Sequence, residues 1–149
     1  MSIALTASPA APPRRAFSGK SLALAAPLAG GLAAASNYAV YALAKVAGAD
    51  FTARFDPSAV GVTELPLGHI AVSSLLPALL GAGVLAVLNL LTAKAERIFI
   101  PLSAVLAVAS CAGPLLLEGA GAGTRAAFVA MHLVTAAIIT GVLRSRGRA

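Results

Sequence analysis

The chain has 149 residues, of which 59% are hydrophobic and 11% are charged, with a mean hydropathy of +0.92. A soluble globular domain carries about 25% charged residues, so the composition indicates one domain embedded in lipid. The net charge of +6 does not indicate nucleic-acid binding, because aromatic residues make up 5% and no basic face is interleaved with them. The single cysteine, Cys111, excludes an internal disulfide and any CxxC redox or zinc motif.

Four stretches lack Asp, Glu, Lys and Arg: residues 21–44, 69–93, 98–117 and 126–143. A helix needs about 20 residues, with a range of about 17–25, to cross a bilayer core about 30 Å thick. A transmembrane barrel needs alternating strands of about ten residues, and these stretches do not alternate. The sequence therefore predicts an all-α integral membrane bundle of four helices over residues 21–143.

The flanks of this domain are short and basic. Residues 1–20 contain three prolines and three basic residues, which predicts a disordered cytoplasmic tail, and residues 144–149 form a second basic tail. The uncharged run 21–44 exceeds the apolar region of about 7–15 residues in a signal peptide. We therefore expect the run to remain as the first transmembrane helix, the alternative being a cleaved signal.

Basic residues are divided unequally between the two sides of the predicted bundle. Three lie on one side, namely Lys45, Arg54 and Arg125, and eight lie on the other: Arg14, Arg15, Lys20, Lys94, Arg97, Arg144, Arg146 and Arg148. Cytoplasmic segments carry the excess of Lys and Arg. We therefore expect a multi-pass protein of the bacterial inner (plasma) membrane with both termini in the cytoplasm.

The connection between the first two spans is the only long one. Apolar residues alternate in "DFTARF" and in "VGVTEL", and the turn sequence Asp56-Pro57-Ser58 separates the two segments. A short extracellular β-hairpin over the outer end of the bundle is expected. The alternative is an irregular loop whose phenylalanines anchor at the membrane interface.

Polar side chains within the spans cluster at one depth. Asn37, Ser73, Ser110 and His132 come from the four successive spans, and at 1.5 Å per residue each lies about 6–11 Å below the outer surface. Tyr41 lies one turn from Asn37 on the same helical face. Thr135 lies one turn deeper than His132.

Two prolines accompany this polar layer. Ser73 lies four residues before Pro77, and Ser110 lies four residues before Pro114. A proline removes the amide that would bond to the carbonyl four residues earlier, so both helices are expected to kink and to widen the outer half, while the cytoplasmic half packs tightly. Two other prolines are expected only to open their helices, namely Pro27 and Pro101.

These features together predict a ligand pocket in the outer leaflet. Its expected lining is Asn37, Tyr41, Ser73, Pro77, Ser110, Pro114, His132 and Thr135. The alternative is structural: His132 and Asn37 would make interhelical hydrogen bonds worth about 0.6–2 kcal/mol. Small residues spaced by four, Gly30 with Ala34 and Gly31 with Ala35, predict close helix contact. No metal site and no cofactor are predicted.

The order of motifs resembles a known family. These motifs are "SNYAVYALAKVAGADF", "SSLLPALLGAGVLAVL", "PLSAVLAVASCAGPLL" and "AFVAMHLVTAAII". Together they are similar to a group of small four-helix bacterial membrane proteins of unknown function, frequent in actinobacteria. Pro77 and the pair Met131-His132 are the most specific matches. The resemblance implies the architecture and no activity or cofactor.

Three functions are compatible with the sequence. The first is binding of a small molecule or lipid, with a link to transport. The second is a structural or accessory role, in which the chain holds a second copy or a partner membrane protein. The third is a membrane enzyme with His132 as base, which ranks last because no carboxylate, second histidine or nucleophile triad accompanies it in the spans. The expected surroundings are membrane lipids, and no nucleic acid is expected.

The charge asymmetry makes a testable prediction about topology. In intact cells, a reagent that cannot cross the membrane should modify neither chain end, and both ends should react once the membrane is opened. Modification of one end only in intact cells would contradict the predicted orientation.

Overall fold

A computed structural model describes residues 16–56, 58 and 60–149. Its elements are α1 Gly19–Val46, β1 Thr52–Ala53, β2 Thr63–Glu64, α2 Leu67–Leu91, α3 Ala95–Ser110, α4 Ala112–Leu116 and α5 Ala122–Arg146. Within the described residues, four helical segments are long and apolar enough to cross a membrane: α1, α2, α5, and α3 continued by α4. The predicted four-helix membrane fold is therefore confirmed.

The helices extend beyond the predicted limits at the ends of the chain. The Ser18 hydroxyl accepts a hydrogen bond from the Ser21 amide, at 3.0 Å, and caps α1, which begins at Gly19. Phe17 is buried and forms an antiparallel bridge with Arg148. The predicted tail boundaries at 20 and 144 are therefore wrong, because capping and burial order residues 17–20 and α5 continues to Arg146. Residues 1–15 of the predicted tail lie outside the described residues.

The prolines affect their helices differently. Pro27 lies inside α1 and Pro101 inside α3, so the prediction that they open their helices is wrong. α2 continues without interruption through Pro77. In contrast, α3 ends at Ser110, four residues before Pro114, and the chain resumes as the short α4. The interruption lies where a proline removes a backbone donor.

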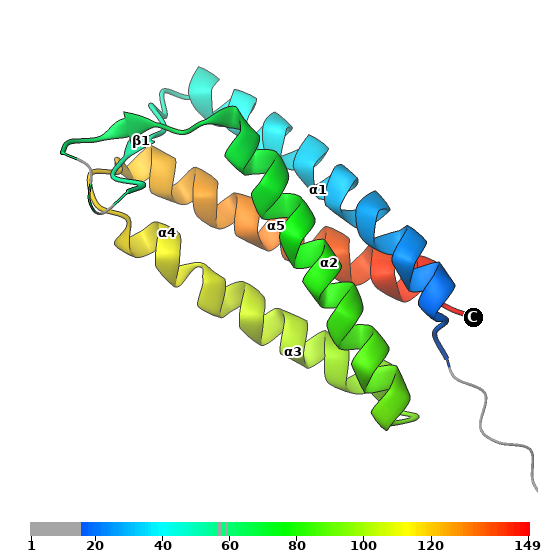
Figure 1. Cartoon of the computed structure of the whole chain (residues 1–149). Coiled ribbons are helices and arrows are strands. Elements are labelled where there is room, and N and C mark those ends of the chain that lie inside the picture. The colour runs from blue at the N-terminus through cyan, green and yellow to red at the C-terminus, as the bar shows by residue number, and fades with distance from the viewer. Residues whose placement is uncertain (1–15, 57, 59) are drawn as a thin grey trace, which may run out of the picture.

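The closest packing joins α1 to α2 and α5, as Figure 1 shows. The buried face of α1 consists mainly of small side chains, namely Ala25, Ala26, Ala29, Gly30 and Ala33. A Cβ atom placed on Gly30 would lie 2.9 Å from the Leu75 Cα atom, whereas one on Gly31 would meet nothing within 4 Å. Of the two predicted small-residue pairs, the one containing Gly30 therefore lies in the contact with α2.

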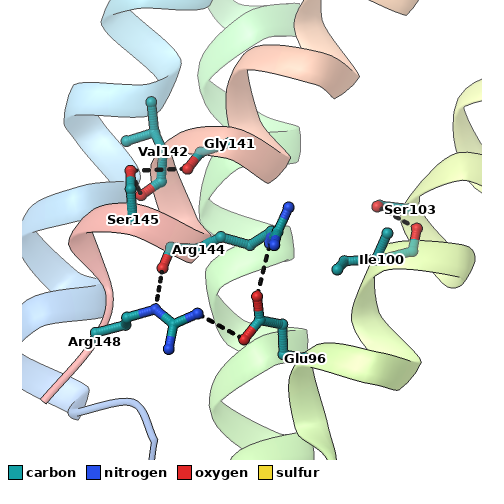
Figure 2. Close-up of polar contacts among 8 residues, drawn as sticks. All are labelled: Glu96, Ile100, Ser103, Gly141, Val142, Arg144, Ser145 and Arg148. Carbon is teal, nitrogen blue, oxygen red and sulfur yellow. Dashed lines mark hydrogen bonds and ion pairs between the residues drawn. The ribbon is translucent and has the colours of Figure 1, made fainter.

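The helix α3 lies apart from this three-helix core, and only Ala95 and Phe99 are buried along it. Its first turn is held at the end of the bundle where both described chain ends meet, which we call the terminal end (Figure 1). There the Glu96 carboxylate accepts from Arg144 Nε and from Arg148 Nη2, each at 2.8 Å (Figure 2). These ion pairs attach α3 to the last turn of α5 and to the residues after it.

The opposite end, which we call the hairpin end, carries the predicted β-hairpin. Strands β1 and β2 pair antiparallel, with Thr52 opposite Glu64. Phe51 precedes β1 with a positive φ of 55° and is fully buried. Its ring packs 4.5 Å from the ring of Tyr41 and 5.5 Å from that of Phe128, measured between centroids. The hairpin thus covers α1 and α5 through aromatic contact.

Hydrogen bonds to the α4–α5 connection and to the first turn of α5 fix the hairpin in place. The Thr124 hydroxyl accepts from the Phe51 amide at 3.1 Å and donates to Asp50 Oδ1 at 2.8 Å. The Arg54 amide donates to the Glu118 carbonyl oxygen at 2.9 Å. The hydroxyl of Thr124, followed by that of Thr52, lowers the pKa of the Asp50 carboxyl, since both stabilise the charged form.

Replacement of Gly30 tests the close approach of α1 and α2. Gly30→Ala should destabilise the protein by about 1–3 kcal/mol, because the neighbouring atom is backbone that must move. Gly31→Ala is the matched control and should be neutral or slightly stabilising, since nothing contacts it. Unfolding in mixed micelles measures both; equal effects would contradict the packing.

Acid should release the hairpin through Asp50. The pKa of Asp50 in the folded protein lies below the ordinary value of 3.8. The stability that the charged Asp50 carboxylate contributes is therefore complete above pH 3.8, and it is lost as the pH falls through the pKa of the folded state. The near-ultraviolet circular dichroism of the Tyr41 cluster should decline in this range, and less so in Asp50→Asn. An identical decline in that variant would assign the loss to other carboxyl groups.

Candidate functional site: a cavity between α2, α3 and α5

One asparagine joins the three core helices. Asn37 of α1 donates from Nδ2 to Ser74 Oγ of α2 at 3.0 Å and to Thr135 Oγ1 of α5 at 2.8 Å. The Ser74 hydroxyl donates its own hydrogen to the Ile70 carbonyl oxygen at 2.7 Å, so its oxygen can only accept from Asn37. This fixes the orientation of the amide, and both Nδ2 hydrogens are used.

The other end of the same amide is unsatisfied. Asn37 is 4% exposed, and its Oδ1 atom has no hydrogen-bond partner among the described residues. A buried acceptor left unpaired costs about 1–3 kcal/mol. The orientation that satisfies Ser74 and Thr135 therefore leaves one strong acceptor available within the bundle.

Asn37 lies on the wall of a cavity of about 490 Å³. The cavity runs between α2, α3 and α5, from Leu65 and Phe128 near the hairpin end to Phe99 and Thr140 toward the terminal end. Most of the lining is apolar, and the described residues contribute no Asp, Glu, Lys or Arg to it. The terminal half contains the packed core that was expected, a buried cluster that includes Leu22, Leu85, Phe99 and Leu143, and the cavity reaches the edge of this cluster at Phe99.

His132 presents a second acceptor to the cavity. Its Nδ1 atom lies 2.8 Å from the Phe128 carbonyl oxygen. A carbonyl can only accept, so Nδ1 carries the hydrogen and Nε2 of the neutral ring carries a lone pair. Among the described residues Nε2 has no hydrogen-bond partner. The same residues contain no group of three His, Cys, Asp or Glu side chains placed to hold a metal ion.

The structure brings six of the eight predicted site residues to the cavity: Asn37, Ser73, Pro77, Ser110, His132 and Thr135. Tyr41 and Pro114 are not in its lining. Tyr41 packs against Phe51 in the hairpin cluster, and Pro114 is buried in α4. Nor does His132 bond to Asn37 or to a serine, because the Phe128 carbonyl already takes its Nδ1 hydrogen.

Two adjacent serines of α2 have different surroundings: Ser73 lines the cavity as predicted, whereas Ser74, which the sequence analysis did not single out, bonds to Asn37 in the core. The Ser73 hydroxyl donates to the His69 carbonyl of its own helix at 2.5 Å, whereas Ser74 is fully buried and bonds to Asn37. A signal for this was present in the sequence. Ser74, Ala78 and Ala82 recur at a spacing of four, which places small residues on one face of α2, and all three are buried.

Comparisons with known proteins place the chain in a family. No curated protein and no solved structure shows significant similarity to it. A family profile described as a family of unknown function, DUF6069, matches residues 17–149, which include all five described helices and the hairpin. The four-helix membrane fold and this match together show that the chain belongs to the DUF6069 family.

Proposed function

We propose that this integral membrane protein binds a small lipid-soluble molecule in the cavity between α2, α3 and α5. The observation that carries the proposal is the buried Asn37 Oδ1 atom, which has no hydrogen-bond donor among the described residues and belongs to a residue in the wall of a cavity of about 490 Å³. If Asn37 served only to hold the helices together, both its amide nitrogen and its amide oxygen would be expected to have hydrogen-bond partners. A bound molecule supplies the missing partner.

The cavity reaches the apolar outer surface of the bundle. Three of its lining residues, Leu80 of α2 and Leu102 and Leu106 of α3, are 62%, 38% and 58% exposed. These leucines lie on the apolar outer surface, which faces acyl chains in a membrane. A ligand would therefore enter laterally between α2 and α3, after partitioning into the bilayer.

The proposed orientation places the terminal end in the cytoplasm and the hairpin end outside. The start of α1, the end of α5 and the α2–α3 connection lie at the terminal end (Figure 1). These segments contain Lys20, Arg146 and Lys94. At the hairpin end, Lys45 pairs with Glu64 at 2.7 Å and Arg54 with Glu118 at 3.5 Å. This distribution of basic residues supports a cytoplasmic terminal end by the positive-inside rule.

Filling the cavity should displace a bound molecule. Ala107→Phe places a ring at a lining position of α3, whereas Ala109→Phe places the same ring two residues away at an exposed, non-lining position. Native mass spectrometry of protein extracted gently from membranes should show a co-purifying small molecule in the wild type and in Ala109→Phe, and its loss in Ala107→Phe. An adduct that is retained equally in both variants, or absent from the wild type, would argue against the proposal.

A further inference from the structure

We infer that the ligand is a neutral molecule that carries a hydrogen-bond donor, such as an alcohol or a phenol, on an otherwise apolar body. This inference rests on the proposed function and names the chemical class of its ligand. In the bound state the ligand's O–H or N–H group donates to Asn37 Oδ1, which is buried in the free protein and which the ligand reaches by displacing the side chains that cover it, and His132 Nε2 is the second acceptor on the same cavity wall.

The polar atoms of the wall are mostly acceptors. All three lining serines have already donated their hydroxyl hydrogens to carbonyl oxygens of their own helices: Ser73 to His69, Ser103 to Ile100 and Ser110 to Ala107. Asn37 has donated both amide hydrogens, and His132 has donated from Nδ1. Among the described lining residues, only the hydroxyls of Thr135 and Thr140 and the exposed ring of His69 retain a hydrogen without an assigned acceptor.

A cavity wall rich in hydrogen-bond acceptors distinguishes between ligands, because a ligand without a donor leaves the acceptors of the wall unpaired. A ligand with an O–H group satisfies Asn37 Oδ1, whereas a ligand with only ether or carbonyl oxygens adds another acceptor and leaves Oδ1 orphaned. Sites built from buried polar groups reject analogues that lack the matching group, because the site's own atoms are then unsatisfied. The geometry therefore favours donors over acceptors of the same size.

The ligand must also be neutral. The described lining has no Asp, Glu, Lys or Arg side chain, and an ion moved out of water without a partner costs several kcal/mol. Carboxylate, phosphate and ammonium head groups therefore do not fit within the cavity. The apolar remainder of the wall accommodates a hydrocarbon or aromatic body.

Because the chain contains no tryptophan, the fluorescence of a single introduced tryptophan reports on its position alone. Leu106→Trp places the only indole at the cavity wall, and Val105→Trp places it one residue away at an exposed, non-lining position. The probes are 4-iodophenol and 4-iodoanisole, which differ only by methylation of the hydroxyl and quench indole emission through iodine. At neutral pH the phenol is uncharged. Val105→Trp corrects for the partition of each probe into micelles.

The phenol is expected to quench Leu106→Trp at a concentration about 5–10-fold lower than the anisole, the ratio that corresponds to one satisfied hydrogen bond. Equal quenching by both probes, above the Val105→Trp control, would overturn the donor inference and leave the cavity's binding role intact. If neither probe quenches Leu106→Trp beyond the control, the proposed function itself fails.

A second set of variants assigns the acceptor. Asn37→Leu in the reporter background should remove the preference for the phenol while the anisole still binds. Because this variant removes the donor to the hydroxyl oxygens of Ser74 and Thr135, the triple replacement Asn37→Leu, Ser74→Ala and Thr135→Val is made in parallel, which removes the whole network at once. If either variant folds and still prefers the phenol, the assignment of the acceptor to Asn37 is overturned.

Discussion

The bundle depends on one amide that reaches two other helices. Lipid tails are as apolar as leucine, so transmembrane helices gain little from hydrophobic burial against one another and rely on close packing and polar contacts. Asn37 supplies the polar contact, to Ser74 and Thr135. Because its two hydrogen bonds are directional, they also fix the depth of α1 relative to α2 and α5. Every other part of the site is positioned by this three-helix core.

The cavity follows from an unequal distribution of small residues. Helix α1 presents alanines and Gly30 to its neighbours, so backbones approach closely there. Helix α3 instead carries large side chains that stay exposed, including Val105, Leu106 and Val108. It is attached through Phe99 and the Glu96 ion pairs at one end and through α4 at the other. A fourth helix held mainly at its ends leaves space beside the core, and that space is the proposed binding site.

The fold was predictable because its causes are local. The absence of charge over about 20 residues is sufficient to specify a spanning helix, and alternation on either side of a turn specified the hairpin. Which face of each helix packs against its neighbours was harder to predict from the sequence. Ser73 and Ser74 lie at nearly the same depth but point about 100° apart around the helix, so depth alone could not identify the one that meets Asn37. Tyr41 was predicted at the cavity, but the hairpin's Phe51 packs against it instead.

The unsatisfied Asn37 oxygen was beyond reach from sequence, since it results from the hydrogen bonds of three separate helices. The Ser74 hydrogen goes to Ile70, and this directs Nδ2 toward Ser74 and leaves Oδ1 without a partner among the described residues. A leucine at position 37 would have no unpaired oxygen, but it would also lose the hydrogen bonds to Ser74 and Thr135. Sequences that specify a fold are otherwise consistent at every level, and the exceptions concentrate at functional sites. A polar group that stabilises the core with one end and remains unpaired at the other is such an exception, and the proposed ligand would supply the missing donor.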